Sequence, residues 1–179
     1  MRTPILDLKI PEHAYFFGFV QADGHLLGNS EAKGALSVEI ADRDAHIFET
    51  FASLLPVASH LSNRTRDTNF KKNYRSATWR VHDQAFRREI ETLGMPIGDK
   101  HDVVAPPSVP FSEPDYWRGA VDANGSLGLS RKSADGIVKP FLSLATASNQ
   151  MADGFCAFEF TFTKKTKKVN PNSRDGIWN

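Results

Sequence analysis

The sequence lacks the features that mark several classes of protein. It has one cysteine, Cys156, among 179 residues, which excludes an internal disulfide and a zinc-finger ligand set. No apolar run approaches the roughly 18 residues needed to cross a bilayer, and residues 1–13 have no apolar signal-peptide centre. We therefore expect an intracellular protein in a reducing compartment.

The chain also has almost no net charge, since its 22 basic residues are balanced by 21 acidic ones. A net charge of +1 gives the average surface no attraction for a polyanion. Two segments depart from this average, because residues 64–80 carry six basic residues and one acid, and residues 160–174 carry five and none. With 40% hydrophobic residues, of which the aromatic ones make up 11% of the chain, the sequence can build a core, which excludes general disorder.

An internal repeat organises the chain. YFFGFVQADG at residues 15–24 aligns with YWRGAVDANG at residues 116–125, and each copy follows a proline and an acid that signal a helix start. Each unit is predicted as helix, two strands, helix, two strands, with a closing helix at residues 83–93 in the first unit that ends at Gly94. The second unit lacks a counterpart of this closing helix.

Between the units, five of the ten prolines lie in the stretch from Pro96 to Pro114, which marks a stiff, extended linker. We therefore divide the chain into a first repeat at residues 1–95, a linker at 96–113 and an incomplete second repeat at 114–179.

Small residues spaced four apart lie on one face of each repeated helix. They are Gly18 and Ala22 in the first copy, and Gly119 and Ala123 in the second. One such pair is more often an ordinary helix contact, but two matching faces can pack on each other and join the halves.

Each repeated helix ends in a polar residue and a glycine, Asp23-Gly24 and Asn124-Gly125. The glycines are predicted as left-handed helix caps. A carboxylate is unfavourable at this end of the helix dipole, so Asp23 is either part of a common Asp-Gly turn or a ligand for a divalent cation. Oxygen ligands without a His/Cys cluster favour magnesium over zinc.

These paired segments resemble the signature helices of the LAGLIDADG homing endonuclease family, with Gly, Ala, Asp or Asn, and Gly at the third, seventh, eighth and ninth places. The resemblance covers nearly the whole chain. It implies an α+β protein with two pseudo-symmetric αββαββα repeats, a monomer whose two saddle-shaped antiparallel sheets bind double-stranded DNA. It also implies Mg²⁺ or another divalent cation and staggered double-strand breaks, in a family associated with intron and intein mobility.

The resemblance also implies the residues of the centre. Metal ligands are expected at Asp23, Asn124, Ala22 and Ala123, and Asn124 departs from the family's acidic residue. Lys100 is similar in place to a basic residue near the family's active site, where a cation stabilises phosphate charge. A surface lysine in a linker is an equal alternative.

The two basic segments are expected to form ribbons that contact DNA, because a two-stranded ribbon fits the major groove and Arg or Lys reaches bases and phosphates. Alternation lets about half of the residues face the duplex. A solvated face is the usual explanation of such runs, but two runs at equivalent repeat positions favour DNA. The candidates are Arg64, Arg66, Lys71, Lys72, Arg75, Arg80, Arg131, Lys132, Lys164, Lys165, Lys167, Lys168 and Arg174.

Two functions follow from this sequence. The first is a metal-dependent DNA endonuclease that cuts a long site, impaired or reduced to nicking by Asn124. The second keeps the nucleic-acid surface without cutting, as in intron maturases and LAGLIDADG-containing transcription regulators. Asp23 with Lys100 favours the enzyme, and Asn124 with the missing closing helix of the second unit favours the second function.

Overall fold

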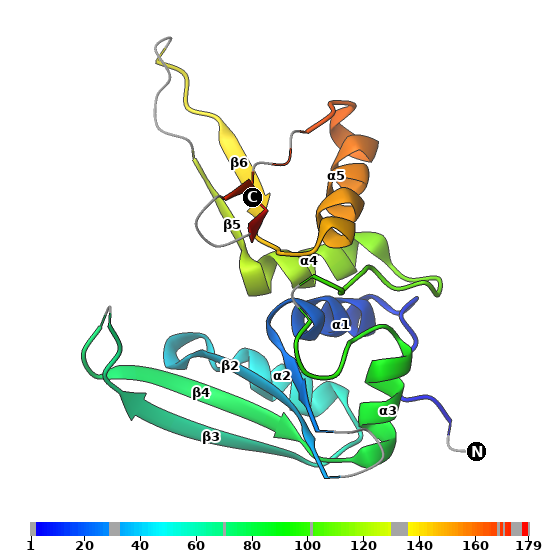
Figure 1. Ribbon diagram of the computed structural model, residues 1–179, viewed down its shortest axis with the longest axis vertical. Helices are drawn as coiled ribbons and strands as arrows, with labels where there is room; N and C mark the ends of the chain where they lie inside the picture. Colours follow the sequence, from blue (N-terminus) through cyan, green and yellow to red (C-terminus); the bar gives the residue numbers. More distant parts are fainter. Residues whose placement is uncertain are drawn as a thin grey trace.

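The computed structural model describes residues 3–28, 33–69, 71–100, 102–129, 136–167, 169, 171–172 and 177–178. Two helices lie against each other at the centre, α1 (Pro11–Asp23) and α4 (Glu113–Asn124). The first half lies on one side of this pair and the second half on the other (Figure 1). Within the described residues, every helix is too short or too polar to span a bilayer.

The first half follows the predicted order of elements. After α1 come β1 (His25–Leu27), β2 (Ala35–Ala41), a short 3-10 turn (Asp42–Asp44), α2 (Ile47–Leu54), β3 (Ser59–Arg66), β4 (Tyr74–Val81) and α3 (Gln84–Thr92). The strands form one antiparallel sheet in the order β1-β2-β4-β3. The Asp83 side chain caps α3 by accepting from Phe86 N, and Gly94, with φ of +111°, follows the helix end as predicted.

One face of this sheet is the core of the first half. Because side chains alternate along a strand, Val38 and its partner Trp79 point to the same side. Trp79 stacks on Phe48 of α2 and meets Phe16 of α1 edge to face. All four side chains are buried, so α1 and α2 cover this face of the sheet.

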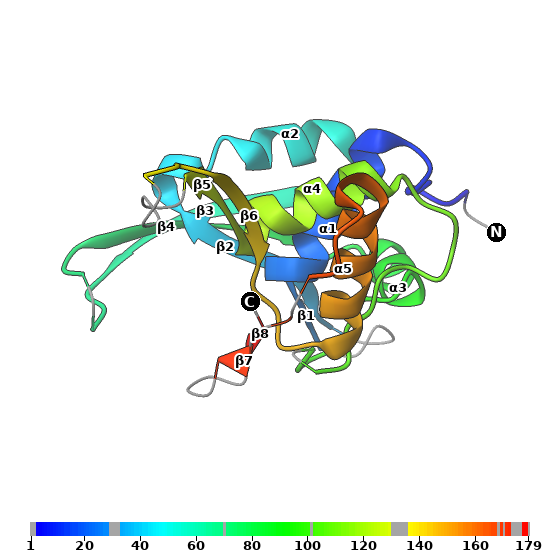
Figure 2. The ribbon, with the colours of Figure 1, turned by 90° about the horizontal axis from the view of Figure 1, so that it is seen from above.

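The second half contains α4, β5 (Gly125–Leu129), β6 (Pro140–Leu144), α5 (Asn149–Thr163), β7 (Pro171–Asn172) and β8 (Ile177–Trp178). Its strands form two separate antiparallel pairs, β5-β6 and β7-β8. Helix α5 packs beside α4 (Figure 2), where the Trp117 ring meets Phe155 and Phe158.

Leucines on the β5-β6 hairpin are exposed. Leu127 and Leu129 are 77% and 70% exposed, whereas Leu144 on the same face is buried. The core of the second half therefore ends near Leu144, and the hairpin extends beyond it.

The linker is irregular rather than simply extended. It turns at Lys100, whose carbonyl accepts from Val103 N and Val104 N. Gly98 N donates to Leu26 O at 2.9 Å, and the Val104 side chain is buried. The linker thus packs beneath the ends of the central helices.

Candidate DNA-binding and catalytic site

The helix pair is close because glycines stand at its contact points. A β-carbon on Gly18 would lie 2.0 Å from Tyr116 O, and one on Gly119 would lie 2.1 Å from Tyr15 O. Both distances are far below van der Waals contact, so neither position accommodates a side chain. This contact brings the C-terminal ends of the helices to one place.

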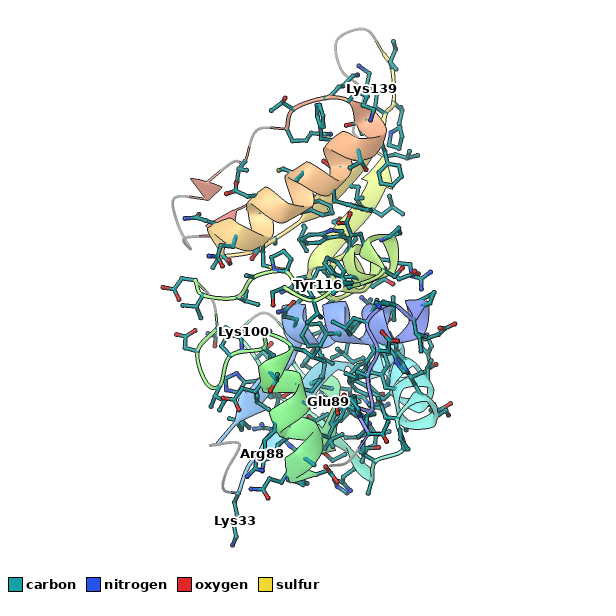
Figure 3. All side chains as sticks on the ribbon, turned by 90° about the vertical axis from the view of Figure 1, so that its right-hand side faces the viewer. Lys33, Arg88, Glu89, Lys100, Tyr116 and Lys139 are labelled. Atoms are coloured by element: carbon teal, nitrogen blue, oxygen red, sulfur yellow. The ribbon has the colours of Figure 1, made fainter. Side chains whose placement is uncertain are left out.

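Polar groups also bond across the helix pair. Tyr116, which lies between the helices in Figure 3, donates from its hydroxyl to Gln21 Oε1. The Gln21 amide nitrogen donates in turn to Gly94 O and Ala105 O, both at 2.9 Å. On another part of the interface, Tyr15 Oη donates to Asp122 Oδ2 at 2.9 Å. Gln21 and Tyr116 thereby tie the first half, the linker and α4 together.

The glycines after the two helices are not left-handed caps, contrary to the sequence prediction. Gly24 has φ of −75° and Gly125 has φ of −112°, both extended, because the chain passes directly into β1 and β5. Glycine is required because a side chain would clash with the preceding helix: a β-carbon would lie 2.4 Å from Val20 O at Gly24 and 2.6 Å from Val121 O at Gly125. The tight turn places the last helical residues, Asp23 and Asn124, at the mouth of the interface.

Lys100 reaches from the linker to the end of α1 (Figure 3). Its Nζ donates to Gln21 O and Ala22 O, each at 2.7 Å. These carbonyls belong to the last turn of α1, where backbone oxygens lack helical partners and the helix dipole favours a cation. Lys100 therefore lies at the predicted centre and is not a solvated linker lysine.

The electrostatics of Asp23 and Lys100 reflect their burial. Desolvation raises the pKa of Asp23, with Lys100 opposing and Glu39 adding to the shift. Desolvation lowers the pKa of Lys100 to about 8, opposed by the Asp23 charge. Lys100 is thus mainly protonated at pH 7, and each group stabilises the charged form of the other.

Asn124 acts as a donor toward the opposite helix. Its Nδ2 donates to Ala22 O at 3.2 Å, a bond that a carboxylate could not make. Ala22 O therefore accepts from two groups, Lys100 Nζ and Asn124 Nδ2. A carbonyl oxygen has two lone pairs, so both are engaged here.

The oxygen atoms still available as metal ligands fit one magnesium ion better than two. The Asp23 carboxylate and the Asn124 amide oxygen are hard ligands, and Mg²⁺ often uses one or two carboxylates and takes its other ligands from water and phosphate. Among the described residues, no group of three or more His, Cys, Asp or Glu is arranged to hold a metal. Ala123 is half-buried beside Asn124, while the carbonyl of Ala22 is already engaged.

A pocket of about 540 Å³ opens at this centre. Both helix ends contribute to it, and so do the linker and the segment after β6. Its lining includes Asp23, His25, Asp99, Lys100 and Asn124. The carboxylate and the ammonium therefore share a space that is open to a ligand.

The sheet of the first half presents a polar face on the side away from its core. Ser37 pairs with Arg80, Arg64 with Ser76, and Arg66 with Tyr74, which places these side chains on one side. We call this side of the sheet the polar face; its polar residues are His25, Ser37, Glu39, His60, Ser62, Arg64, Arg66, Tyr74, Ser76, Thr78 and Arg80, of which Ser76 and Thr78 are buried. His25 belongs both to this face and to the pocket, so the two are continuous.

The acidic member of the polar face is partnered. Glu39 Oε1 accepts from Ser76 Oγ at 2.7 Å and forms an ion pair with Arg66 Nη2 at 2.9 Å. Arg64 is exposed, and Arg80 is half-buried with its Nη1 3.5 Å from Ser62 Oγ. The face thus carries more positive than negative charge.

Not every predicted DNA contact of the first half lies on this face. Arg75 is on the opposite, helix-covered side, where its Nη2 pairs with Asp42 Oδ2 at 3.1 Å. Lys71 and Lys72 are exposed in the turn between β3 and β4. The alternation therefore separates Arg75 from Arg64, Arg66 and Arg80.

Among the described residues of the second basic segment, the lysines do not lie on a ribbon as predicted. Helix α5 continues to Thr163, and Lys164 follows it in a left-handed conformation. The helix runs on because Phe158 packs on Trp117 and Phe162 on Phe158. Strands β7 and β8 span two residues each.

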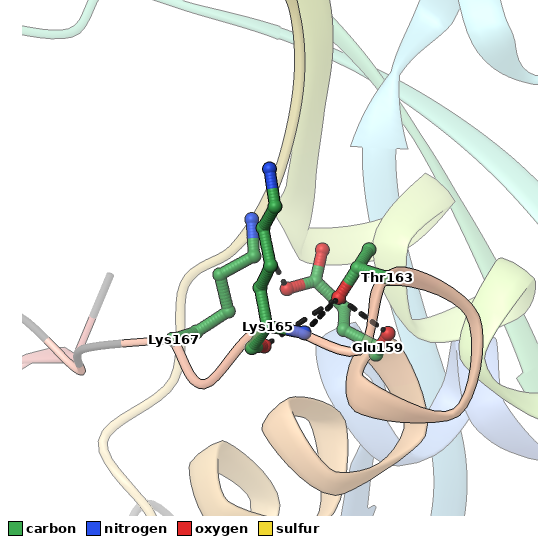
Figure 4. Close-up of polar contacts among 4 residues, drawn as sticks. All are labelled: Glu159, Thr163, Lys165 and Lys167. Carbon is green, nitrogen blue, oxygen red and sulfur yellow. Dashed lines mark hydrogen bonds and ion pairs between the residues drawn. The ribbon is translucent and has the colours of Figure 1, made fainter.

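The described lysines, Lys164, Lys165 and Lys167, lie beyond the end of α5, and Figure 4 shows the last two. Lys167 Nζ is 3.8 Å from Glu159 Oε2, and Lys165 N donates to Thr163 Oγ1 at 3.2 Å. Lys164, Lys165 and Lys167 are exposed, where they complement the helix dipole. The other predicted contacts, Arg131, Lys132, Lys168 and Arg174, lie outside the described residues.

Comparisons with known proteins bear on the fold. No protein-family model and no curated protein matches this chain. Among solved structures, the chain is similar to the "Crystal structure of LAGLIDADG homing endonuclease I-GzeII in complex with DNA target", with a TM-score of 0.51 and 12% sequence identity. The match covers 95% of this chain and 77% of that chain. The fold is similar to that of a LAGLIDADG endonuclease.

Two side chains of this LAGLIDADG-like fold escaped the sequence analysis. His25 lines the pocket, and Glu39 raises the pKa of Asp23 through its charge. Strand alternation could have placed Glu39 on the same face as Ser37, two residues earlier on β2. The pairing of His25 with Ser37, which brings this face next to the pocket, depends on how β1 and β2 meet in space and has no local sequence pattern.

Proposed function

We propose that this chain binds double-stranded DNA and hydrolyses phosphodiesters slowly, cutting at most one strand. The observation that carries this proposal is the continuity of the polar face with the pocket that holds Asp23 and Lys100. Arginines on a twisted sheet can contact phosphates and base edges in the major groove. The similar solved structure is a homing endonuclease in complex with DNA, which agrees with this use of the fold.

In the proposed reaction, Asp23 and the Asn124 amide oxygen would hold one magnesium ion. The chemistry that such an ion supplies is a water of lowered pKa as nucleophile. Lys100 lines the same pocket and is positioned to stabilise negative charge on the phosphate. With one carboxylate in place of two, the site favours nicking over a double-strand break.

A non-cleaving DNA- or RNA-binding function is the second candidate, of the kind found in intron maturases and transcription regulators with this motif. The hydrogen bond from Asn124 Nδ2 to Ala22 O favours it, because the residue donates where the resemblance expects a ligand. In that case the polar face binds the nucleic acid, and the residues around Asp23 and Asn124 only join the two halves.

A cleavage assay separates the two functions. Duplexes bound by the chain would first be selected from a random library, and a supercoiled plasmid carrying a selected site would then be incubated with magnesium. We expect nicked circles from the unaltered chain, linear product from Asn124→Asp, and neither from Asp23→Asn with binding retained. Binding without nicks in the first two proteins would support the second candidate, and failure to select any duplex would overturn both DNA proposals.

A further inference from the structure

The carbonyl end of α1 is occupied by this chain's own donors. Ala22 O accepts from Lys100 Nζ at 2.7 Å and from Asn124 Nδ2 at 3.2 Å, and Gln21 O accepts from Lys100 Nζ at 2.7 Å. The two donors come from the linker and from α4, so one oxygen atom joins three segments. A carbonyl oxygen at a helix end would otherwise need water or a cation.

We propose that the Lys100 ammonium is a built-in cation that, with the Asn124 amide, takes the place of a metal ion at the carbonyl end of α1. It neutralises this end of the helix dipole and lies beside the Asp23 carboxylate. The two halves are therefore joined at the centre without magnesium, and a magnesium ion finds only a weak site, on the Asp23 carboxylate and the Asn124 amide oxygen.

The surroundings of Lys100 fix the ammonium in this place. Gly98 N bonds to Leu26 O, and Lys100 O accepts from Val104 N at 3.1 Å, so the linker backbone is held on both sides of the lysine. The Gln21 side chain binds Ala105 O further along the linker. The ammonium thus reaches the helix end from a backbone that is already positioned, which lowers the entropic cost of holding it there.

Thermal unfolding without DNA tests this role. The midpoint of the unaltered chain is expected to be the same in millimolar magnesium and in a chelator. Lys100→Met should unfold at a lower temperature in the chelator and recover part of the loss in magnesium, because an ion that binds the native state raises its stability. Calorimetric titration of this variant should give a magnesium affinity about tenfold or more higher, since no ammonium competes for the site.

Two further variants sharpen the test. Asn124→Asp replaces the donor with a second carboxylate, so its midpoint should also become magnesium-dependent. Lys9→Met, a matched change at an exposed lysine, should behave like the unaltered chain in both media.

A midpoint of the unaltered chain that rises with magnesium as much as that of Lys100→Met would overturn the proposal. So would midpoints of Lys100→Met and Asn124→Asp that magnesium does not change. If Lys100→Met does not fold in the chelator, folding that magnesium restores supports the proposal, and failure in both media contradicts it. Because DNA is absent, a negative result leaves the proposed DNA binding to its own assay.

Discussion

At the scale of single residues, the ionised Asp23 side chain lowers the stability of the folded protein. Its carboxylate is partly buried at the negative end of a helix dipole, and desolvation raises its pKa. A raised pKa in the folded state means that ionisation destabilises the native protein. The penalty is absent in acid, where both states are protonated, grows as the pH rises above the unfolded-state pKa, and is complete above the folded-state pKa.

Asp23→Asn should therefore raise the thermal midpoint at neutral pH, and the gain should disappear as the pH falls below the usual range of an aspartate. Midpoints measured across that range check this. Asp102→Asn, a change at an exposed linker aspartate, serves as the control and should have little effect at any pH. A lower midpoint of Asp23→Asn at neutral pH would show that attraction to Lys100 outweighs desolvation.

Gly18 sets the distance between the helices. Gly18→Ala places a methyl group 2.0 Å from Tyr116 O, so the helices must separate, at an expected cost of about 3 kcal/mol or more in the free energy of unfolding. Gly98→Ala is the matched change, because nothing lies within 4 Å of its β-carbon and its φ of +76° supplies the only strain. Equal losses in denaturant titrations would contradict the role of Gly18 as a contact point.

At the scale of elements, we expect the β5-β6 hairpin to contribute little to stability beyond the pair of Gly125 and Leu144, which lies nearest to α4. Leu127→Ser should cost less than about 0.5 kcal/mol, as exposed positions usually do, whereas Leu144→Ala should cost about 2 to 5 kcal/mol. Urea unfolding of both variants measures the difference. A large cost at Leu127, which is 77% exposed, would mean that another surface covers the hairpin in solution.

Local sequence patterns predicted much of the first half. The repeated segments identified the central helices, and the alternation at Leu36 and Val38 gave the buried face of β2. The site was harder, because the contact of Lys100 with α1 depends on a turn in an irregular linker. The extension of α5 depends on packing between Trp117 and Phe158, two residues from different helices, which no local pattern reports.

At the scale of the molecule, the two halves share a helix pair but differ in their sheets. The first half presents a four-stranded sheet with a charged polar face, and the part of the second half that the structure describes presents two short strand pairs. We therefore expect the first half to make most of the specific contacts with DNA. Phosphate contacts make binding depend on salt, with a slope of about −0.9 per neutralised phosphate in log-log form.

The most direct test compares three arginines of the same sheet, two on its polar face and one on the opposite side. Duplex affinity would be measured by fluorescence anisotropy over a range of salt for the unaltered chain, Arg64→Ala, Arg80→Ala and Arg75→Ala. Arg64 and Arg80 lie on the polar face, and Arg75 pairs with Asp42 on the other side. We predict weaker binding and a salt-dependence slope smaller by about 1 for Arg64→Ala or Arg80→Ala, and unchanged binding for Arg75→Ala. Equal effects on the two sides, or loss confined to Arg75→Ala, would contradict the assignment of DNA to the polar face.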